Sequence, residues 1–292
     1  MYHRYYGLSR PPFGVTPDPS LLYMSAMHKE ALAMIMYGVE SRKGFMVCSG
    51  EVGMGKTTVL RAYFEQSNSE DTRIVYVFTP QIGVEETIRH IAEEIGIADP
   101  PSGFAGVQAL QSRLLELYHA GKTVVLIVDE AQVLPPRTLE FLRLLSNFET
   151  DREKLIQIVL VGQPELDDLL ARRDLRQVND RVTLRATLKP FSFGESLKYI
   201  RHRLVATGAV SSRHVLSTAA ARGIARGAGG IPRRINILAD NVLIAGYAME
   251  QRPVTGRLAR ATVREFLKRS QPSRAESRGI FGWLGRSRES YS

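Results

Sequence analysis

Short runs of apolar residues alternate along the chain with longer segments in which apolar residues recur at helical spacing. Four of the five short runs are continuous and rich in valine, isoleucine and leucine, as expected for strands that are covered on both faces. Such alternation is typical of a parallel sheet built from strand and helix units. It predicts strands over residues 44–49, 73–79, 123–128, 156–162 and 181–188.

The strand pattern ends after about residue 190, and four consecutive segments then carry only helical spacing. Serine, arginine and glycine dominate residues 270–292, apart from one short apolar stretch. We therefore predict an α/β core over residues 1–190, a helical unit over residues 191–269, and a basic, disordered tail over residues 270–292.

The composition narrows the class of protein. No apolar run approaches the roughly 18 residues that a membrane-spanning helix needs, and the first residues lack the apolar segment of a secretory signal. A single cysteine, Cys48, excludes an internal disulfide framework and a multi-cysteine metal site. Its position within an apolar strand predicts a buried, unreactive thiol. These features together predict an intracellular, cytoplasmic protein.

The formal net charge is +9, but it is unevenly distributed. Residues 251–292 hold 10 Lys/Arg and 3 Asp/Glu, a net charge of +7, which leaves only +2 for the first 250 residues. A solvated terminal segment accounts for such an excess as well as a nucleic-acid interface does. The overall charge therefore does not by itself indicate a DNA-binding protein.

The segment GEVGMGKTT lies between the first predicted strand and a predicted helix. A phosphate site needs several backbone N–H groups that point to one spot, a helix N-terminus behind them and a cation. Glycines permit the backbone conformations, Lys56 can reach the β and γ phosphates, and the Thr57 hydroxyl can ligate Mg²⁺. In place of a simple glycine turn, the segment predicts an ATP-binding loop formed by Gly50, Glu51, Val52, Gly53, Met54, Gly55, Lys56, Thr57 and Thr58.

Two carboxylates, Asp129 and Glu130, follow the apolar run TVVLIV. In an NTPase an aspartate at this place holds the Mg²⁺ shell, and the next acidic residue orients or deprotonates the attacking water. An ordinary helix cap is the alternative, and the upstream loop favours the catalytic interpretation. Gln163 follows the next strand, where it can contact the same water or the γ-phosphate, or else cap the helix that Pro164 opens.

Arginine side chains neutralise charge that develops on a transferring phosphoryl group, from the same subunit or from a neighbour. Candidates lie after the fourth strand, at Arg176, Arg181 and Arg185, and at the start of a late helix, at Arg233 and Arg234. Taken singly, each of them is by default a surface residue.

These motifs together resemble the AAA+ ATPases over roughly residues 5–265. More closely, the stretch from YYGLSRPPFGVTPDP to GEVGMGKTT is similar to the start of the ExeA-type, or general secretion pathway protein A, ATPases. The stretch VDEAQVLPPRTLEFLRLLSNFETDREKLIQIVLVGQPEL is similar to their Walker-B to sensor-1 region. The resemblance implies an α/β P-loop fold with a five-stranded parallel sheet in the order 5-1-4-3-2 and a C-terminal helical lid. It also implies ATP and Mg²⁺ as ligands, ATP hydrolysis to ADP and phosphate, and assembly into a ring or filament.

The resemblance also assigns roles to single residues. Gln163 falls at the sensor-1 position, where many AAA+ proteins have asparagine, and Arg233 falls at the sensor-2 position. Arg181, just before the fifth strand, is the implied arginine finger that acts on a neighbouring subunit, with Arg176 as the other candidate. In the N-terminal segment, Phe13 and Thr16 either contact the edge of the adenine base or only hold the N-terminus in place.

Beyond the predicted lid, the sequence departs from that of the larger ExeA-type proteins. Larger ExeA-type proteins continue into a transmembrane helix and a periplasmic peptidoglycan-binding domain, whereas this sequence ends soon after the lid. We therefore do not expect this chain to share the whole membrane-spanning role in secretin assembly of those larger proteins. The resemblance implies an ATP-driven assembly or regulatory factor, cytoplasmic or peripheral at the inner membrane, for an envelope machine such as secretion, pilus or polysaccharide export.

A second hypothesis is an ATP-switched DNA-binding regulator, similar to the transposition regulators TnsC and MuB. The arginines of the lid and tail fit this hypothesis, and a solvated basic helix fits them equally. The stretch GIFGWLG around Trp283 is a candidate contact to an anionic membrane or a partner groove, or part of a tail without a partner. The candidate partners are thus a second copy of the chain, an envelope or secretion component, DNA, and a membrane surface reached by the tail.

Overall fold

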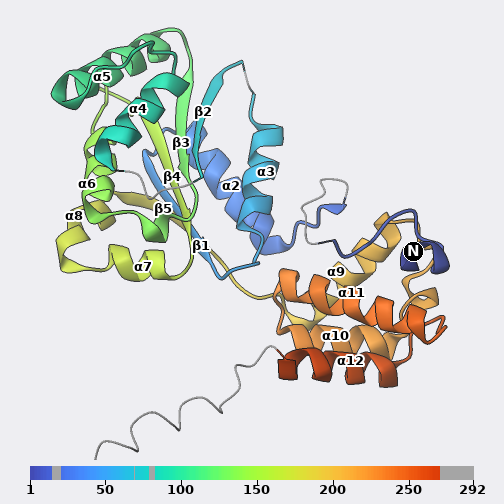
Figure 1. Ribbon diagram of the computed structural model, residues 1–292. Helices are drawn as coiled ribbons and strands as arrows, with labels where there is room; N and C mark the ends of the chain where they lie inside the picture. The colour runs from blue at the N-terminus through green and yellow to red at the C-terminus, as the bar shows by residue number, and fades with distance from the viewer. Residues whose placement is uncertain (15–20, 69, 79–82, 270–292) are drawn as a thin grey trace, which may run out of the picture.

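The structure is a computed structural model that describes residues 1–14, 21–68, 70–78 and 83–269. Figure 1 shows an α/β part built on one sheet and a cluster of helices that follows it in the chain. Neighbouring strands of the sheet are all parallel, in the order β2-β3-β4-β1-β5. The strands are β1 (Phe45–Gly50), β2 (Thr72–Val77), β3 (Thr123–Val128), β4 (Ile156–Gly162) and β5 (Val182–Leu188).

The five predicted strands and the implied order 5-1-4-3-2 are confirmed. β3 and β4 have the predicted bounds, whereas β1 and β2 differ from them by one or two residues at both ends and β5 by one residue at its start. Apolar spacing locates the centre of a strand, but the ends depend on where the ladder of hydrogen bonds stops. Residue 79, the predicted end of the second strand, lies outside the described residues.

Helices cover both faces of the sheet (Figure 1). Successive strand residues point to opposite faces, so that Phe45 and Val47 pack in one core while Met46 and Cys48 pack in the other. The first core also includes side chains of α4 (Val84–Glu94), α5 (Gly103–His119), α6 (Pro136–Leu145) and α7 (Glu165–Leu170). The second includes side chains of α2 (Ala26–Glu40) and α3 (Lys56–Gln66). The shorter elements before β5 are η2 (Ala131–Val133), η3 (Arg173–Leu175) and α8 (Arg176–Asn179).

The predicted burial of the cysteine is confirmed. Cys48 is 1% exposed, and desolvation raises the pKa of its thiol to about 12. Since the thiolate is the reactive form, a thiol with this pKa is inert at neutral pH.

The helical part has a hydrophobic core of its own. It contains α9 (Phe193–Ala206), η4 (Ser212–His214), α10 (Thr218–Ala228), α11 (Pro232–Ala248) and α12 (Gly256–Arg269). The N-terminal segment packs in the same core, because Tyr6, Leu8 and Phe13 are buried there and α1 (Tyr2–Tyr5) contacts α11. Residues 1–14, which we grouped with the α/β core, therefore pack with the helical part. The domain bounds at residues 190 and 269 stay predictions.

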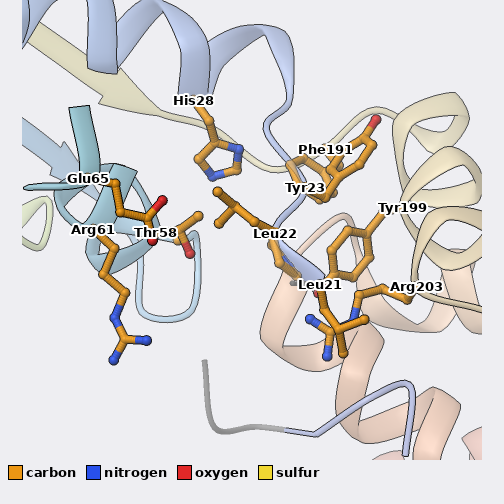
Figure 2. A pocket seen from close by; sticks show the side chains of 12 residues that line it. Leu21, Leu22, Tyr23, His28, Thr58, Arg61, Glu65, Phe191, Tyr199 and Arg203 are labelled. Atoms are coloured by element: carbon orange, nitrogen blue, oxygen red, sulfur yellow. The ribbon is translucent and has the colours of Figure 1, made fainter. Parts of the chain in front are cut away.

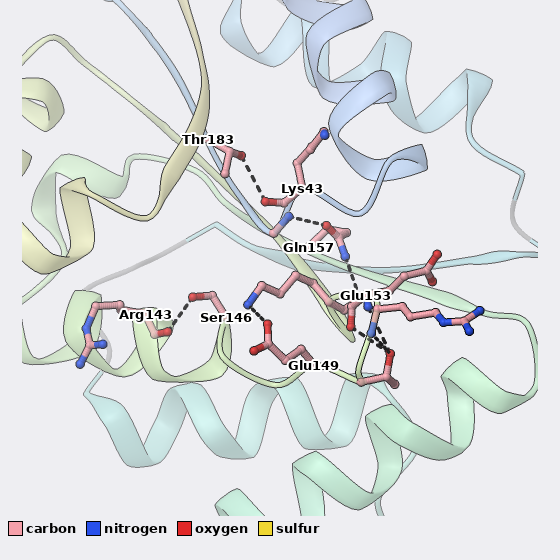
Figure 3. A network of polar contacts seen from close by, with 11 residues as sticks. Lys43, Arg143, Ser146, Glu149, Glu153, Gln157 and Thr183 are labelled. Carbon is pink, nitrogen blue, oxygen red and sulfur yellow. Dashed lines mark hydrogen bonds and ion pairs between the residues drawn. The ribbon is translucent and has the colours of Figure 1, made fainter.

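A network of polar contacts fixes the amino ends of β1, β4 and the edge strand β5 (Figure 3). The backbone N–H of Gly44 donates to Oε1 of the fully buried Gln157 at 2.8 Å, and Thr183 donates to the carbonyl oxygen of Lys43 at 3.2 Å. Arg42 pairs with Glu153 at 3.1 Å. These contacts join the starts of β1, β4 and β5 at the end of the sheet opposite the glycine-rich loop.

No described helix is both long enough and apolar enough to cross a membrane. Two features of the sequence analysis, Thr16 and the tail over residues 270–292 with Trp283, lie outside the described residues.

Candidate nucleotide-binding site

The glycine-rich loop joins the carboxyl end of β1 to the start of α3. Gly53 and Gly55 have φ angles of 81° and 94°, in the left-handed region that other residues rarely adopt. A Cβ atom at Gly53 would lie 2.5 Å from Cβ of Arg233, and one at Gly55 would lie 2.7 Å from Nε2 of His28. The loop thus needs glycine for its conformation and for its close contacts with α11 on one side and α2 on the other.

Lys56 is the first residue of α3 and is 7% exposed. Its Nζ donates to the carbonyl oxygens of Gly50 at 2.6 Å and Glu51 at 3.3 Å. The ammonium group is therefore held within the loop, next to the first backbone N–H groups of the helix. A glycine-rich loop, a helix N-terminus and a cation meet here, which is the arrangement that a phosphate group requires.

His28 on α2 supports the loop from behind, and the sequence analysis did not identify it. Its Nε2 lies 2.8 Å from the carbonyl oxygen of Met54, and its Nδ1 lies 2.8 Å from Oγ and 3.3 Å from the backbone N of Ser25. A carbonyl oxygen only accepts, so Nε2 carries the proton and Nδ1 accepts from Ser25. The ring is 4% exposed, and desolvation holds the pKa of His28 below its ordinary value. A neutral histidine thus connects the start of α2 to the loop.

The spacing Ser-x-x-His at the start of α2 was the available signal for this contact. Ser25 caps the helix and exchanges hydrogen bonds with His28, as the serine of a capping box does with a glutamate. A histidine in the place of the usual glutamate leaves its second ring nitrogen free to reach another segment. Only the fold reveals that the segment is the loop.

Asp129 follows β3 and is held by two hydrogen bonds. Its Oδ2 accepts from the hydroxyl of Tyr76 on β2 at 3.0 Å, and its Oδ1 accepts from the backbone N–H of Glu130 at 2.9 Å. Desolvation and the charge of Asp129 keep the pKa of Tyr76 well above its ordinary value, so the tyrosine stays a donor. The carboxylate is 4% exposed and its orientation is fixed.

Glu130 has a φ angle of 52° and its side chain is bound by two amides. Its Oε2 accepts from Nε2 of Gln132 at 2.7 Å and from Nε2 of Gln163 at 3.2 Å. The bond from Gln132, followed by the bond from Gln163 and the charge of Lys56, lowers the pKa of Glu130 despite partial desolvation. The carboxylate is therefore ionised at neutral pH, as a group that orients or deprotonates water must be.

The structure brings Gln163 to Glu130, and thereby favours a place in the site over the alternative of a helix cap. The backbone N–H of Gln163 donates to Oε1 of Gln132 at 3.0 Å. Gln132 thus bonds both residues, although the sequence analysis overlooked it. Its position two residues after Glu130 was the only sequence signal.

The start of α11 closes the site from the helical part. The backbone N–H of Arg233 donates to the carbonyl oxygen of Gly53 at 3.3 Å. A cavity of about 360 Å³ lies between the loop and this helix. Its lining includes Lys56, Thr57 and Glu130 from the α/β part with Arg233 and Asn236 from the helical part. Of the two arginines predicted at this helix start, Arg233 is the one that lines the cavity.

A smaller, more apolar cavity of about 70 Å³ adjoins the first (Figure 2). His28 and Thr58 line it from the α/β part, and Phe191, Tyr199 and Arg203 from the helical part and the segment that leads to it. The rings of Phe191 and Tyr199 lie 5.6 Å apart, and both contact Tyr23, which also lines the cavity. At about 30 Å³ per water molecule this cavity holds only about two waters, so an aromatic wall lies beside the phosphate-binding loop but the space is too small for a purine base.

Phe13 does not line either cavity. It is 1% exposed in the core of the helical part, and the adjacent carbonyl oxygens of Pro12 and Gly14 accept hydrogen bonds from the Arg203 guanidinium at 2.6 Å and 3.2 Å. The alternative in which Phe13 holds the N-terminus in place therefore fits the structure, and the suggested base contact does not. The aromatic residues beside the cavity come instead from Tyr23, Phe191 and Tyr199.

The arginines before β5 lie far from the loop of their own chain. Val182, at the start of β5, pairs with Phe45 at the start of β1, whereas the loop follows the end of β1. The length of this six-residue strand, about 20 Å, separates the two places. Arg176 and Arg181 are both exposed. Both arginines therefore lie at the end of the sheet opposite this chain's own loop.

The residues present fit a magnesium nucleotide. The described residues contain no group of three or more His, Cys, Asp or Glu side chains that would form a metal site from protein alone. Mg²⁺ binds well to one or two protein oxygens together with substrate phosphates. The exposed Thr57 hydroxyl and the fixed Asp129 carboxylate supply such oxygens beside Lys56.

Comparisons with known proteins agree with this geometry. The family model described as AAA domain matches residues 39–170, which include the loop and both carboxylates. The chain is 43% identical over 252 residues to the general secretion pathway protein A of Aeromonas hydrophila. The matched region covers 85% of this chain and 45% of that protein, so the chain spans less than half of the relative's length.

Solved structures share the fold at low sequence identity. The ORC2 protein of Aeropyrum pernix, solved in ADPNP and ADP complexes, is 20% identical with a TM-score of 0.62, over 88% of this chain and 72% of that chain. The RuvB Holliday junction branch migration motor of Thermotoga maritima is 16% identical with a TM-score of 0.51, over 84% and 73% of the two chains. These likenesses concern the fold alone.

Proposed function

Because the chain belongs to the AAA+ P-loop ATPases, in the group of general secretion pathway protein A, we propose that it binds ATP with Mg²⁺ and hydrolyses it. The observation that carries this proposal is the meeting of Lys56 and Glu130 at one cavity, with the buried Asp129 carboxylate bound to the backbone N–H of Glu130 beside it. A glycine turn without function would not need a buried lysine or two fixed carboxylates.

Each residue has a distinct role in this proposal. The backbone from Gly50 to Thr58 and the Lys56 ammonium would bind the phosphates, and Thr57 and Asp129 would hold Mg²⁺, whose charge would offset that of the phosphates. Glu130 orients or deprotonates the attacking water, and Gln163 fixes the position of the Glu130 carboxylate by donating a hydrogen bond to it. Arg233, at the edge of the same cavity, provides positive charge from the helical part.

An arginine finger from a second copy would complete the site. We assign this role to Arg181, with Arg176 as the alternative. The test mixes two variants that should each be inactive alone: Lys56→Ala, whose nucleotide binding is weakened, and Arg181→Ala, which retains its loop. ATPase activity should return on mixing, because the first variant supplies Arg181 to the second. If Arg176→Ala and not Arg181→Ala behaves in this way, the finger is Arg176. If neither does, the assignment of a finger to this segment is wrong.

We further propose that the ATPase serves as an assembly or regulatory factor for a bacterial envelope machine such as secretion, pilus or polysaccharide export. It would act in the cytoplasm or at the inner membrane, and as a ring or filament of several copies. The support is the identity to general secretion pathway protein A over most of this chain. The alternative function is that of an ATP-switched DNA-binding regulator of the TnsC or MuB type. The basic residues of helices α10 and α12 support this alternative.

One experiment separates the two functions. The ATPase rate is measured against protein concentration, with and without double-stranded DNA, at two salt concentrations. An envelope factor should show activity that rises with self-assembly and does not respond to DNA. Strong stimulation by DNA that falls steeply with salt would favour the DNA-binding regulator, since phosphate contacts release counterions. Absence of ATPase activity at every protein concentration would refute hydrolysis itself.

A further inference from the structure

A groove lies between α10 and α12, outside the nucleotide site. Its floor is formed by Gly223 and Gly227 of α10 with Val263 and Leu267 of α12, and its rim carries Arg260, Arg264 and Lys268. The groove encloses about 320 Å³. At about 30 Å³ per water molecule this is room for roughly ten waters, which is enough for a few apolar side chains and far more than an ion needs.

The glycines of α10 have different reasons to be present. A Cβ atom at Gly227 would lie 2.4 Å from Cγ1 of Val263, so close packing of the two helices requires glycine there. A Cβ atom at Gly223 would lie 3.5 Å from Cγ of Arg260, which is an ordinary contact. Packing does not require glycine at residue 223. Because Gly223 has no side chain, the groove stays open there.

The charge around the groove is strongly one-sided. α10 and α12 together contain seven Lys/Arg and one Asp/Glu. That one acidic residue, Glu265, pairs with Arg269 at 2.5 Å. Among the described residues, no ion pair joins Arg260, Arg264 or Lys268. The rim therefore presents three cations to whatever occupies the groove.

We propose that this groove docks an acidic amphipathic helix of a partner protein. Apolar side chains at i and i+4 of such a helix would fill the floor, and carboxylates beside them would pair with the rim. A nucleic acid would satisfy the rim but not the apolar floor, because phosphates bind to cations and not to aliphatic side chains. The chain's own tail is disfavoured, since residues 270–292 carry four arginines and two glutamates and so have the same charge sign as the rim.

The proposal is independent of ATP binding, and four variants of the full chain test it. Gly223→Leu fills the groove without a backbone clash, and Gly194→Leu, on the exposed start of α9 with open space around it, is its matched control. Arg264→Glu reverses a rim charge, and Arg257→Glu reverses an equally exposed charge on the same helix that does not line the groove. Circular dichroism and thermal unfolding establish that each variant folds.

A random peptide library displayed on phage is selected on the wild-type chain, and enriched sequences are synthesised for titration. The expected sequences are acidic and contain leucine or phenylalanine at helical spacing. Gly223→Leu and Arg264→Glu should each weaken their binding at least tenfold, while Gly194→Leu and Arg257→Glu should change it less than twofold.

Three results would overturn the proposal. The first is a selection that enriches no sequence class or a basic one. The second is equal weakening by Arg264→Glu and Arg257→Glu, which would indicate a general effect of charge. The third is DNA binding to this face. A labelled 30-base-pair duplex would then bind more weakly to Arg264→Glu and to Arg257→Glu than to the wild-type chain, and equally well to Gly223→Leu.

Discussion

His28→Ala should destabilise the protein and impair nucleotide binding, because one side chain connects α2 to the phosphate-binding loop. The substitution leaves two buried groups without their partner, the carbonyl oxygen of Met54 and the backbone N–H of Ser25. An unsatisfied buried polar group costs roughly 1–3 kcal/mol. At about 1.5 kcal/mol each, the free energy of unfolding should fall by about 3 kcal/mol. For a chain of this size, that corresponds to a drop in Tm of roughly 6–12 °C.

The measurement combines thermal unfolding with titration of a fluorescent ATP analogue. His28→Gln is the rescue variant, since its amide can donate to Met54 and accept from Ser25, and it should recover part of both losses. His119→Ala, at the exposed end of α5, is the control and should lie within about 0.5 kcal/mol of wild type. If His28→Ala lowers Tm but nucleotide affinity stays at the wild-type value, His28 supports the fold and does not position the loop. If neither changes, the reasoning from buried hydrogen bonds is wrong.

The same histidine predicts a dependence of stability on pH. Desolvation lowers the pKa of His28 in the folded state below the value of about 6.5 for an unperturbed histidine. Between these two values the unfolded state binds a proton that the folded state does not, so stability must decrease as pH falls below about 6.5. Protonation would also place an N–H at Nδ1 against the N–H of Ser25. The slope of Tm against pH below this value should be smaller in His28→Gln than in wild type.

Three further predictions concern the chemistry of the site. Lys56→Ala removes a charge-assisted contact worth roughly 1.5–3 kcal/mol, so nucleotide affinity by titration should fall about 10- to 150-fold; affinity near wild type would refute the loop assignment. Glu130→Gln should bind ATP with near wild-type affinity and release phosphate at under a hundredth of the wild-type rate; full turnover would contradict its role. Gln132→Leu removes the main contact that lowers the pKa of Glu130, so the acid limb of the pH–rate profile should move to higher pH; an unmoved limb would show that another group titrates there.

Local patterns of apolar residues suffice to predict most of the α/β part. The runs at residues 123–128 and 156–162 are continuous and apolar, and their strands are buried along nearly their whole length. A strand covered on both faces leaves few alternatives to such a run. In the edge strand β2 only Val75 and Val77 are buried, and its predicted end was the least accurate. The order of the strands came from the resemblance to AAA+ proteins, since spacing along the chain does not encode which strands pair.

The site was predictable where one residue type at one spacing carries the chemistry. Lys56, Asp129 and Glu130 satisfy this condition, because each follows an apolar strand within a recognisable motif. His28 and Gln132 do not, because their partners are a backbone carbonyl 26 residues away and two side chains that converge only in the fold. The sequence left two alternatives open for Phe13 for a related reason: an aromatic residue in a terminal segment can pack in whichever core lies nearest, and here this is the core of the helical part.

The two loop glycines place the phosphate-binding loop against both the helical part and α2. Gly53 contacts Arg233 on α11, and Gly55 contacts His28 on α2, so the loop lies between two elements that are far apart in the sequence. His28 in turn contacts the ring of Phe191 at 5.7 Å, in the segment that leads to α9. Packed side chains have few intermediate arrangements, so a rotation of the helical part must change the contacts of Gly53 and of His28 together. A ligand that changes the shape of the loop would therefore bind with different free energies to the two positions of the helical part, before and after such a rotation. This difference is the condition for ATP to act as a conformational switch.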